Sequence, residues 1–313
     1  MRNVEDKILN TNDIKSKVDS VLNRFNTVFS TWDYDSEISL FNRALDTNGI
    51  IISEDLKNVI NRSLSISNKT NGHFDITVFD LMSFWGFGPK PYKKPINLDR
   101  VDSILNYTGY KFLKLDKNIL TKKHPLLKID LNSIAKGYGV DKIFNYLVGQ
   151  NFKDIFVEIG GEVRAIGKNP KRSFWKIGIE DPHENAKTKK SFAGIVELNN
   201  KSMATSGNYR NFIKYKNEVL GHTINPTTGM PEVFLNYVKN FNSDLLGLFY
   251  NTDSMLTFKH RSITEQQQIQ VHKSNLMGAE AIYGHLQIFR GLKHFHVDDF
   301  EIQPCQDKMS NKV

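Results

Sequence analysis

The chain contains 313 residues, of which 39% are hydrophobic and 21 are phenylalanine, ample for one large domain or two ordinary ones. It has no apolar run of the roughly 18 residues needed to cross a bilayer. Its first dozen residues show no secretory signal, and its only cysteine, Cys305, excludes an intramolecular disulfide. The formal net charge of +8 suits an anionic partner such as a nucleotide diphosphate, or is only a basic surface, and no nucleic-acid-binding motif accompanies it.

Helical periodicity dominates the first third of the chain. Apolar residues recur three or four positions apart, which is typical of amphipathic helices. The spacing predicts helices over residues 13–29, 54–67 and 98–106. A polar turn at 31–37 leads into a short apolar helix that ends near Phe41.

The middle of the chain alternates apolar and polar residues as strands do. The predicted strands are Lys111–Leu115, Leu126–Leu131, Ile155–Ile159, Trp175–Ile179 and Ile195–Leu198. A helix over Ser133–Leu147 directly follows the second of them. With no internal repeat and no glycine-rich linker, we expect a mixed α/β domain over residues 1–233.

Residues 234–313 have a different composition. Five of the nine histidines come after residue 258, next to a run of three glutamines, and turn glycines become sparse. We therefore expect a divergent C-terminal segment, separate from the α/β domain and only weakly helical in its periodicity.

The segment from Leu126 to Leu147 is a candidate anion site. Asp130 ends the predicted strand, and the backbone N–H groups of Asn132 and Ser133 lie where a helix start would present them to an anion. Lys136 follows one turn later, where it could reach a phosphate or pair with Asp130. An N-capped helix with an ordinary salt bridge would explain the same residues, so this segment alone leaves the choice open.

Four further features are candidates for a ligand site. Gly160 and Gly161 interrupt an apolar strand, as in a plain bulge or where a ligand approaches closely. His222 opens a polar turn, and histidine can act as acid or base near neutral pH. The Trp32 ring sits in a polar turn, where it could stack on a flavin or purine or pack as a lid. Trp85 is better explained as a core residue.

In this order, the segments resemble the ApbE family of FAD:protein FMN transferases. The resemblance covers about two-thirds of the chain, and several independent motifs in the right order make it specific. The matching segments are Phe29–Trp32 with Asp33 to Asn42, Gly72–Leu81 with Trp85–Gly88, Ile129–Asp141, Val157–Glu162 with Trp175–Pro182, Thr205–Tyr209 and His222–Pro231.

The resemblance implies a T-fold-like α/β domain that binds FAD. With Mg²⁺, the family cleaves the FAD pyrophosphate, joins FMN to a Ser or Thr of an acceptor flavoprotein and releases AMP. His222 would then assist deprotonation of the acceptor hydroxyl, and the Ser133 carbonyl would lie near the metal. The residues predicted to contact FAD are Trp32, where the family usually has Tyr, His73, Phe74, Asp75, Asp130, Lys136, Gly160, Gly161 and Ile224.

The two ends of the chain differ from the family pattern. Members usually begin with a signal or lipid-anchor motif and a first strand, and this chain starts at the helix that follows. After the histidine turn the family has a helix whose Asp and Thr, four residues apart, complete the Mg²⁺ site. Here Asp253 and Thr257 have that spacing, which places them on one face if the segment is helical.

The sequence therefore predicts a Mg²⁺-dependent FAD:protein FMN transferase. Two alternatives stay open: an FAD pyrophosphatase that gives FMN and AMP, and a degenerate flavin-binding protein without activity. The family usually acts in the periplasm or at the membrane, whereas the visible sequence carries no export signal and would leave the protein cytoplasmic.

Overall fold

The structure is a computed structural model that describes residues 11–89, 91–92, 96–180, 192–206, 212–233, 246–251 and 254–257. Within these ranges, helices combine with antiparallel sheets of three, three, five and two strands. The α/β class predicted from the sequence is confirmed. The helices are α1 (Thr11–Phe29), α2 (Glu37–Arg43), α3 (Glu54–Lys69), α4 (Phe79–Phe84), α5 (Leu98–Leu105), the 3-10 turn η1 (Tyr110–Phe112) and α6 (Ala135–Gly149).

The predicted helices α1, α2, α3 and α5 are all present, because local sequence signals define them. The Ser36 hydroxyl accepts the Ser39 N–H at the start of α2, and Ser53 does the same for Leu56 in α3. Buried apolar residues then recur on one face of α3. The short helix α4 was not predicted, since six residues are too few to establish a period.

The first sheet contains β1 (Ile50–Ile51), β2 (Leu113–Asp116) and β3 (Ile119–Lys122), in the order β1-β3-β2. The prediction of a strand over Leu126–Leu131 is wrong, because the partner of β2 is β3. The 126–131 segment begins in a turn and then has no regular secondary structure, and a side chain replaces the strand partner. Asn42 accepts the Ile129 N–H at 2.7 Å and donates to the Ile129 carbonyl at 2.8 Å.

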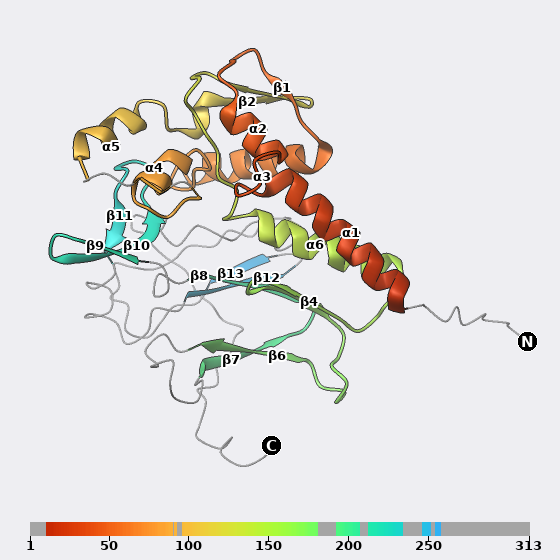
Figure 1. The fold of residues 1–313 in the computed structure, drawn as a ribbon. Helices are drawn as coiled ribbons and strands as arrows, with labels where there is room; N and C mark the ends of the chain where they lie inside the picture. Colours follow the sequence, from red (N-terminus) through yellow and green to blue (C-terminus); the bar gives the residue numbers. More distant parts are fainter. Residues whose placement is uncertain are drawn as a thin grey trace, which may run out of the picture.

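The five-stranded sheet is the centre of the molecule (Figure 1). Helix α6 lies on one of its faces, with α1 packed against α6, and a two-stranded hairpin lies on the other face. The sheet contains β4 (Ile155–Ile159), β5 (Glu162–Ile166), β8 (Lys201–Ser206), β12 (Leu246–Asn251) and β13 (Ser254–Thr257), in the order β13-β12-β8-β5-β4. The hairpin contains β6 (Trp175–Glu180) and β7 (Phe192–Leu198), which include the strands predicted there.

Strand β5 shows how the two faces are separated. Val163 and Ala165 pack among the apolar residues of β6, β7 and β8. Arg164, between them, points to the other face, where its guanidinium lies 4.2 Å from the centre of the Phe144 ring of α6. Glu162 lies on the same side as Arg164 and contacts Lys136 of α6. The alternation of β5 therefore directs two charged side chains toward α6.

Gly160 and Gly161 form the turn between β4 and β5. The sequence predicted that they interrupt a single strand, and this prediction is wrong because they join two strands. Ile159 pairs with Glu162 directly across the two glycines. Both have positive φ angles, 58° and 98°, which a two-residue hairpin turn of type I′ requires. Glycine is the residue that adopts this conformation without steric cost.

A third sheet packs against α4 and α5, as Figure 1 shows on the left. It contains β9 (Phe212–Tyr215), β10 (Glu218–Ile224) and β11 (Pro231–Val233), in the order β11-β10-β9. Trp85, 2% exposed, lies in the core between this sheet and the helices, which confirms its assignment as a core residue. Its indole N–H donates to the Gly229 carbonyl at 2.7 Å, so α4 is tied to the turn after β10.

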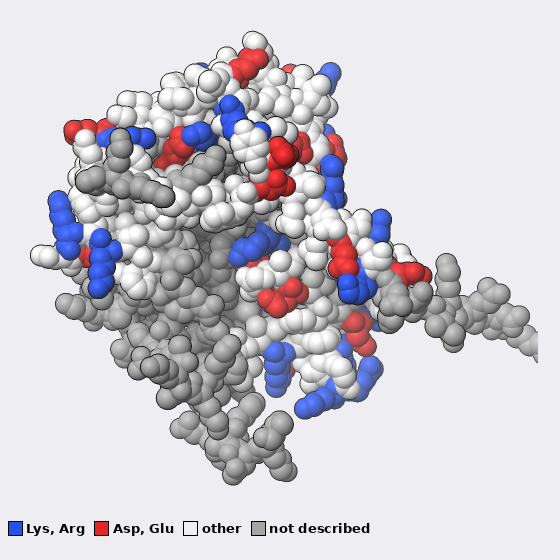
Figure 2. All heavy atoms as spheres, in the orientation of Figure 1, with Lys and Arg blue, Asp and Glu red and all other residues white. Residues whose placement is uncertain are grey.

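On the face seen in Figure 2, lysine and arginine side chains are interspersed with acidic ones, without one large basic patch among the described residues. None of the described helices is both long enough and apolar enough to span a bilayer. The boundary expected at residue 233 stays a prediction. Strands β12 and β13, beyond that boundary, lie in the same sheet as β8.

Candidate functional site

The 130–136 segment forms the first part of the site. The Asp130 N–H donates to the Ile76 carbonyl at 2.8 Å, which joins this segment to residues 73–77. The buried Asp130 carboxylate accepts the Asn132 N–H and the Asn132 side-chain amide, both at 2.9 Å. Burial raises the pKa of Asp130 to about 6, although these two hydrogen bonds favour the charged form. Ser133 follows in a turn, and α6 begins at Ala135.

Lys136 pairs with Glu162, so the pairing with Asp130 that the sequence left open is not found. The Lys136 ammonium lies 3.1 and 2.9 Å from the two carboxylate oxygens of Glu162. It also contacts the Gly160 carbonyl at 3.4 Å. Lys136, Gly160 and Gly161, all predicted to bind FAD, therefore come together where the β4–β5 turn meets the first turn of α6.

The 73–77 segment supplies the next predicted contacts. His73 is exposed and Phe74 is buried in the core. The Asp75 carboxylate points inward and accepts the Thr77 N–H and hydroxyl, at 2.8 and 2.6 Å, and the Tyr110 N–H at 2.6 Å. Burial raises the pKa of Asp75, while these hydrogen bonds oppose the shift. In this structure the Asp75 side chain organises the turn, so contact with FAD through that carboxylate stays a prediction.

Trp32 is the most exposed aromatic side chain that the sequence singled out, at 74%. Two hydrogen bonds between serine hydroxyls and the backbone hold its turn. The Ser30 hydroxyl accepts the Asp33 N–H at 3.2 Å, and the Ser36 hydroxyl donates to the Ser30 carbonyl at 2.6 Å. The indole ring is thus held on a structured turn in contact with solvent. That arrangement leaves its faces accessible for stacking on a planar ring.

His222 and Ile224 lie near the end of β10, so the histidine precedes the turn instead of opening it. The His222 ring is partly buried, with its centre 6.2 Å from the Phe87 ring in an edge-on arrangement. The turn itself is ordered by Asn225, whose side chain accepts the N–H groups of Thr227 and Thr228. Because α4 directly follows residues 73–77 and packs on β10, it connects the histidine strand to the rest of the site.

The predicted metal ligands are only partly described. Ser133 lies in the turn before α6, and Asp253 lies outside the described residues. Thr257 ends strand β13, so the helical arrangement considered for Asp253 and Thr257 is not found over 254–257. Within the described residues, no three His, Cys, Asp or Glu side chains are grouped as a metal site. The metal assignments therefore stay predictions.

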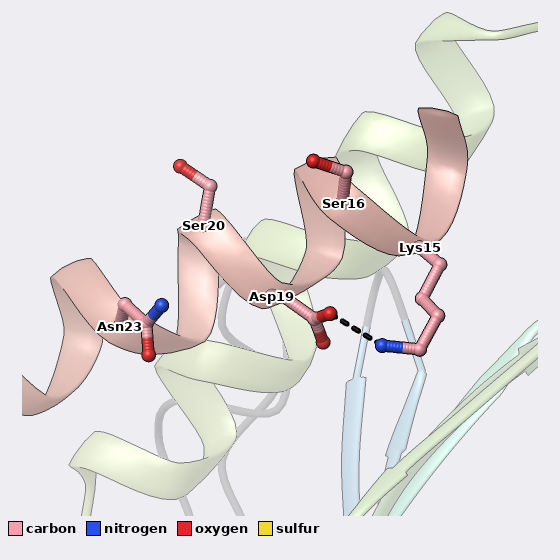
Figure 3. Close-up of a pocket in the computed structure, with 5 residues that line it drawn as sticks. All are labelled: Lys15, Ser16, Asp19, Ser20 and Asn23. Carbon is pink, nitrogen blue, oxygen red and sulfur yellow. Dashed lines mark hydrogen bonds and ion pairs between the residues drawn. The ribbon is translucent and has the colours of Figure 1, made fainter. Parts of the chain in front are cut away.

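A surface hollow elsewhere contains none of the predicted site residues. It follows the outer face of α1 and is lined by Lys15, Ser16, Asp19, Ser20 and Asn23 (Figure 3). The Lys15 ammonium lies 2.6 Å from the Asp19 carboxylate across it. With all its lining side chains from one helix, this hollow does not enclose a ligand.

The model of the ApbE family matches residues 3–237, well over half of the chain. The chain belongs to the ApbE family. It is 34% identical over 225 residues to the FAD:protein FMN transferase of Vibrio cholerae, covering 72% of this chain and 66% of that protein. It is 36% identical over 222 residues to the Haemophilus influenzae protein of the same name, covering 69% of this chain and 63% of the relative. The chain therefore covers less than two-thirds of the length of each of these two relatives.

Solved structures give the same family. The flavin transferase ApbE from Vibrio cholerae superposes with a TM-score of 0.66 at 31% identity, covering 78% of this chain and 75% of that one. The apo form of the flavinyl transferase ApbE from Pseudomonas stutzeri gives a TM-score of 0.65 at 27% identity, covering 77% and 72%. The ApbE fold inferred from the sequence motifs is therefore confirmed.

Glu162 lies within one of the matching segments of this ApbE-family chain, but the sequence assigned it no role. Its position directly after Gly160 and Gly161 is the feature of the sequence that could have indicated a role for this acidic residue. The consequence depended on α6, because Glu162 and Lys136 are 26 positions apart and meet only when the hairpin packs on the helix. Asn42 was missed for the same reason, since its partner Ile129 is 87 positions away.

Proposed function

We propose that this ApbE-family chain transfers FMN from FAD to a Ser or Thr hydroxyl of an acceptor flavoprotein and releases AMP. The observation that carries the proposal is the meeting of Lys136 with the Gly160–Gly161 turn at the start of α6. There a cation lies against a glycine turn near the start of a helix, and a lysine ammonium is a common partner of phosphate groups. Relatives that bear the name FAD:protein FMN transferase support the same reading.

The proposed reaction is an in-line displacement at phosphorus. The acceptor oxygen forms a bond to the phosphorus of the FMN part as the bond to the bridging oxygen breaks, and AMP leaves with that oxygen. His222 would take the proton of the acceptor hydroxyl, which raises the nucleophilicity of the oxygen. Lys136 would bind the diphosphate, and Trp32 would stack on a ring of FAD.

Mg²⁺ fits the chemical class of the predicted ligands, which are the Ser133 carbonyl, the Asp253 carboxylate and the Thr257 hydroxyl. All three are oxygen donors, which Mg²⁺ prefers. When bound, the ion would neutralise charge on the diphosphate. On the protein side, Asp130 shapes this region because its carboxylate holds Asn132 and so fixes the turn that contains Ser133.

The test is release of AMP from FAD by the purified chain. With Mg²⁺ and an acceptor flavoprotein, we expect AMP together with FMN covalently bound to the acceptor, and neither product when EDTA is added. AMP and free FMN in equal amounts, with or without acceptor, would instead identify an FAD pyrophosphatase. A folded protein that binds FAD and releases no AMP would contradict the proposed transfer.

The role of His222 is tested separately by His222→Gln. Transfer should fall at least about a hundredfold, in the range of general base catalysis, while FAD affinity stays within a factor of two to three. His124→Gln is the matched control, because His124 stacks on Tyr107, 5.1 Å between ring centres, and is not among the predicted site residues. Equal losses in the two variants would contradict a catalytic role for His222.

A further inference from the structure

Two ion pairs join β5 to α6. Arg164 of β5 lies 2.7 Å from the Asp141 carboxylate, and their side chains are 14% and 6% exposed. Glu162, two residues earlier on the same face of β5, pairs with Lys136 near the start of the helix. The first pair is buried on both sides. The second differs, because the Lys136 side chain is 30% exposed and that of Glu162 only 1%.

The Lys136 side chain therefore joins a buried carboxylate to a partly exposed position near the surface. One side of the ammonium contacts Glu162 and the Gly160 carbonyl. An ammonium has three N–H donors, so Lys136 can donate to an incoming anion while Glu162 keeps its contact. An approaching diphosphate therefore meets a cation whose position is already set.

The glycine turn contributes to the same arrangement. A Cβ atom added to Gly160 would lie 3.3 Å from Cδ of Lys136, so the lysine stem passes close over the turn. Glu158 accepts the Gly161 N–H at 2.9 Å and fixes the other half of the turn. The stem is thus confined by the turn and the charged end by Glu162, which restricts the rotamers of a side chain that is flexible in isolation.

We propose that Glu162 is a positioning residue that holds the Lys136 ammonium against the Gly160–Gly161 turn in the orientation that binds the FAD diphosphate. The inference rests on the proposed function, because it requires that Lys136 binds FAD. Glu162 does not touch FAD in this proposal and acts only through Lys136. Its contribution must therefore disappear when Lys136 is absent.

The ionisation of Glu162 adds a second signature. Burial raises the pKa of its carboxyl to about 7, although the adjacent Lys136 ammonium opposes the shift. Glu158 on β4 raises it further, and Arg164 beyond it on β5 is paired with Asp141. Below that pKa the protonated carboxyl holds the ammonium less firmly. The advantage of wild type over a neutral variant should therefore grow as the pH rises through about 7.

The experiment is a double-mutant cycle on FAD binding, measured by calorimetry in EDTA so that FAD is not consumed. The variants are Glu162→Gln, Lys136→Met, which keeps the lysine stem, and the double variant. At pH 8.5 we expect Glu162→Gln to weaken binding about tenfold and Lys136→Met to weaken it more. Adding Glu162→Gln to Lys136→Met should then change the affinity less than twofold. At pH 5.5 the affinities of Glu162→Gln and wild type should converge.

Asp141→Asn is the matched control, because it removes the charge of the neighbouring ion pair on the same interface. It should lower thermal stability without a pH-dependent change in FAD affinity. The positioning role would be overturned if Glu162→Gln weakened FAD binding equally in the presence and absence of Lys136. It would also be overturned if Glu162→Gln bound FAD as wild type does, or if the FAD affinity of Asp141→Asn showed the same pH dependence as that of Glu162→Gln. Wild-type binding by Lys136→Met would also overturn the assignment of Lys136 to FAD, which separates the two failures.

Discussion

The substitution Asn42→Ala tests whether one side chain replaces a strand partner in this fold. Asn42 makes two hydrogen bonds, 2.7 and 2.8 Å long, to the N–H and carbonyl groups of Ile129. Ile129 is fully buried, so its backbone groups would lose their partners without reaching bulk water. An unsatisfied buried polar group costs about 1–3 kcal/mol. For two groups, with some relief from water entering the space, we expect a loss of about 3 kcal/mol.

The assay is urea unfolding followed by circular dichroism, with Asn23→Ala as the matched control. Asn23 is exposed on α1, where alanine is the better helix former, so its replacement should change the free energy of unfolding by less than about 0.5 kcal/mol. Asn42→Asp should give an intermediate result, because a carboxylate keeps the acceptor for the Ile129 N–H and loses the donor. If Asn42→Ala unfolds within about 0.5 kcal/mol of wild type, the two bonds do not hold the 126–131 segment.

Gly229→Ala should lower the melting temperature several degrees more than Gly86→Ala. Both glycines have a positive φ angle, so the backbone strain of an alanine is similar at the two positions. A Cβ atom at position 229 would collide with Val101, whereas one at position 86 would enter open space. Equal shifts in thermal melts would contradict this. The free energy of unfolding of Asp130→Asn, relative to that of wild type, should rise by up to about 3 kcal/mol between pH 4 and pH 7. The reason is that burial raises the pKa of Asp130 in the folded state, so wild type loses stability as this carboxyl ionises. Urea unfolding at several pH values checks this, and a difference between the two proteins that does not change with pH would refute it. Asp253→Ala should abolish the Mg²⁺ dependence of AMP release, and an unchanged Mg²⁺ titration would remove this residue from the metal site.

Local signals in the sequence predicted most of the helices, α4 excepted. Recurring apolar positions predicted α3 because that period lies within the element itself, and the serine caps that the structure shows for α2 and α3 also act within three residues of each helix start. The family motifs then placed the site segments in one fold. They could do so because each motif has a characteristic residue pattern and the motifs occur along the chain in the order typical of the family.

Non-local contacts account for what the sequence did not reveal. The 126–131 segment alternates like a strand, yet its backbone groups are bound by Asn42 and by the Ile76 carbonyl. Neither partner is visible in a local pattern. The same holds for the ion pair of Lys136. The sequence left its partner open between a phosphate and Asp130, and the structure pairs it with Glu162 on the adjoining hairpin.

The contrast between Trp32 and Trp85 makes the chain its own optical reporter. Trp32 is 74% exposed and Trp85 2%. Indoles in water emit at longer wavelengths than indoles in an apolar core, so the two rings contribute to different parts of the emission band. Quenching at the long-wavelength edge on adding flavin reports stacking at the polar turn. In a Trp175→Phe background, which removes the third and partly buried tryptophan, a change at the short-wavelength edge reports a shift where α4 is tied to the Gly229 carbonyl.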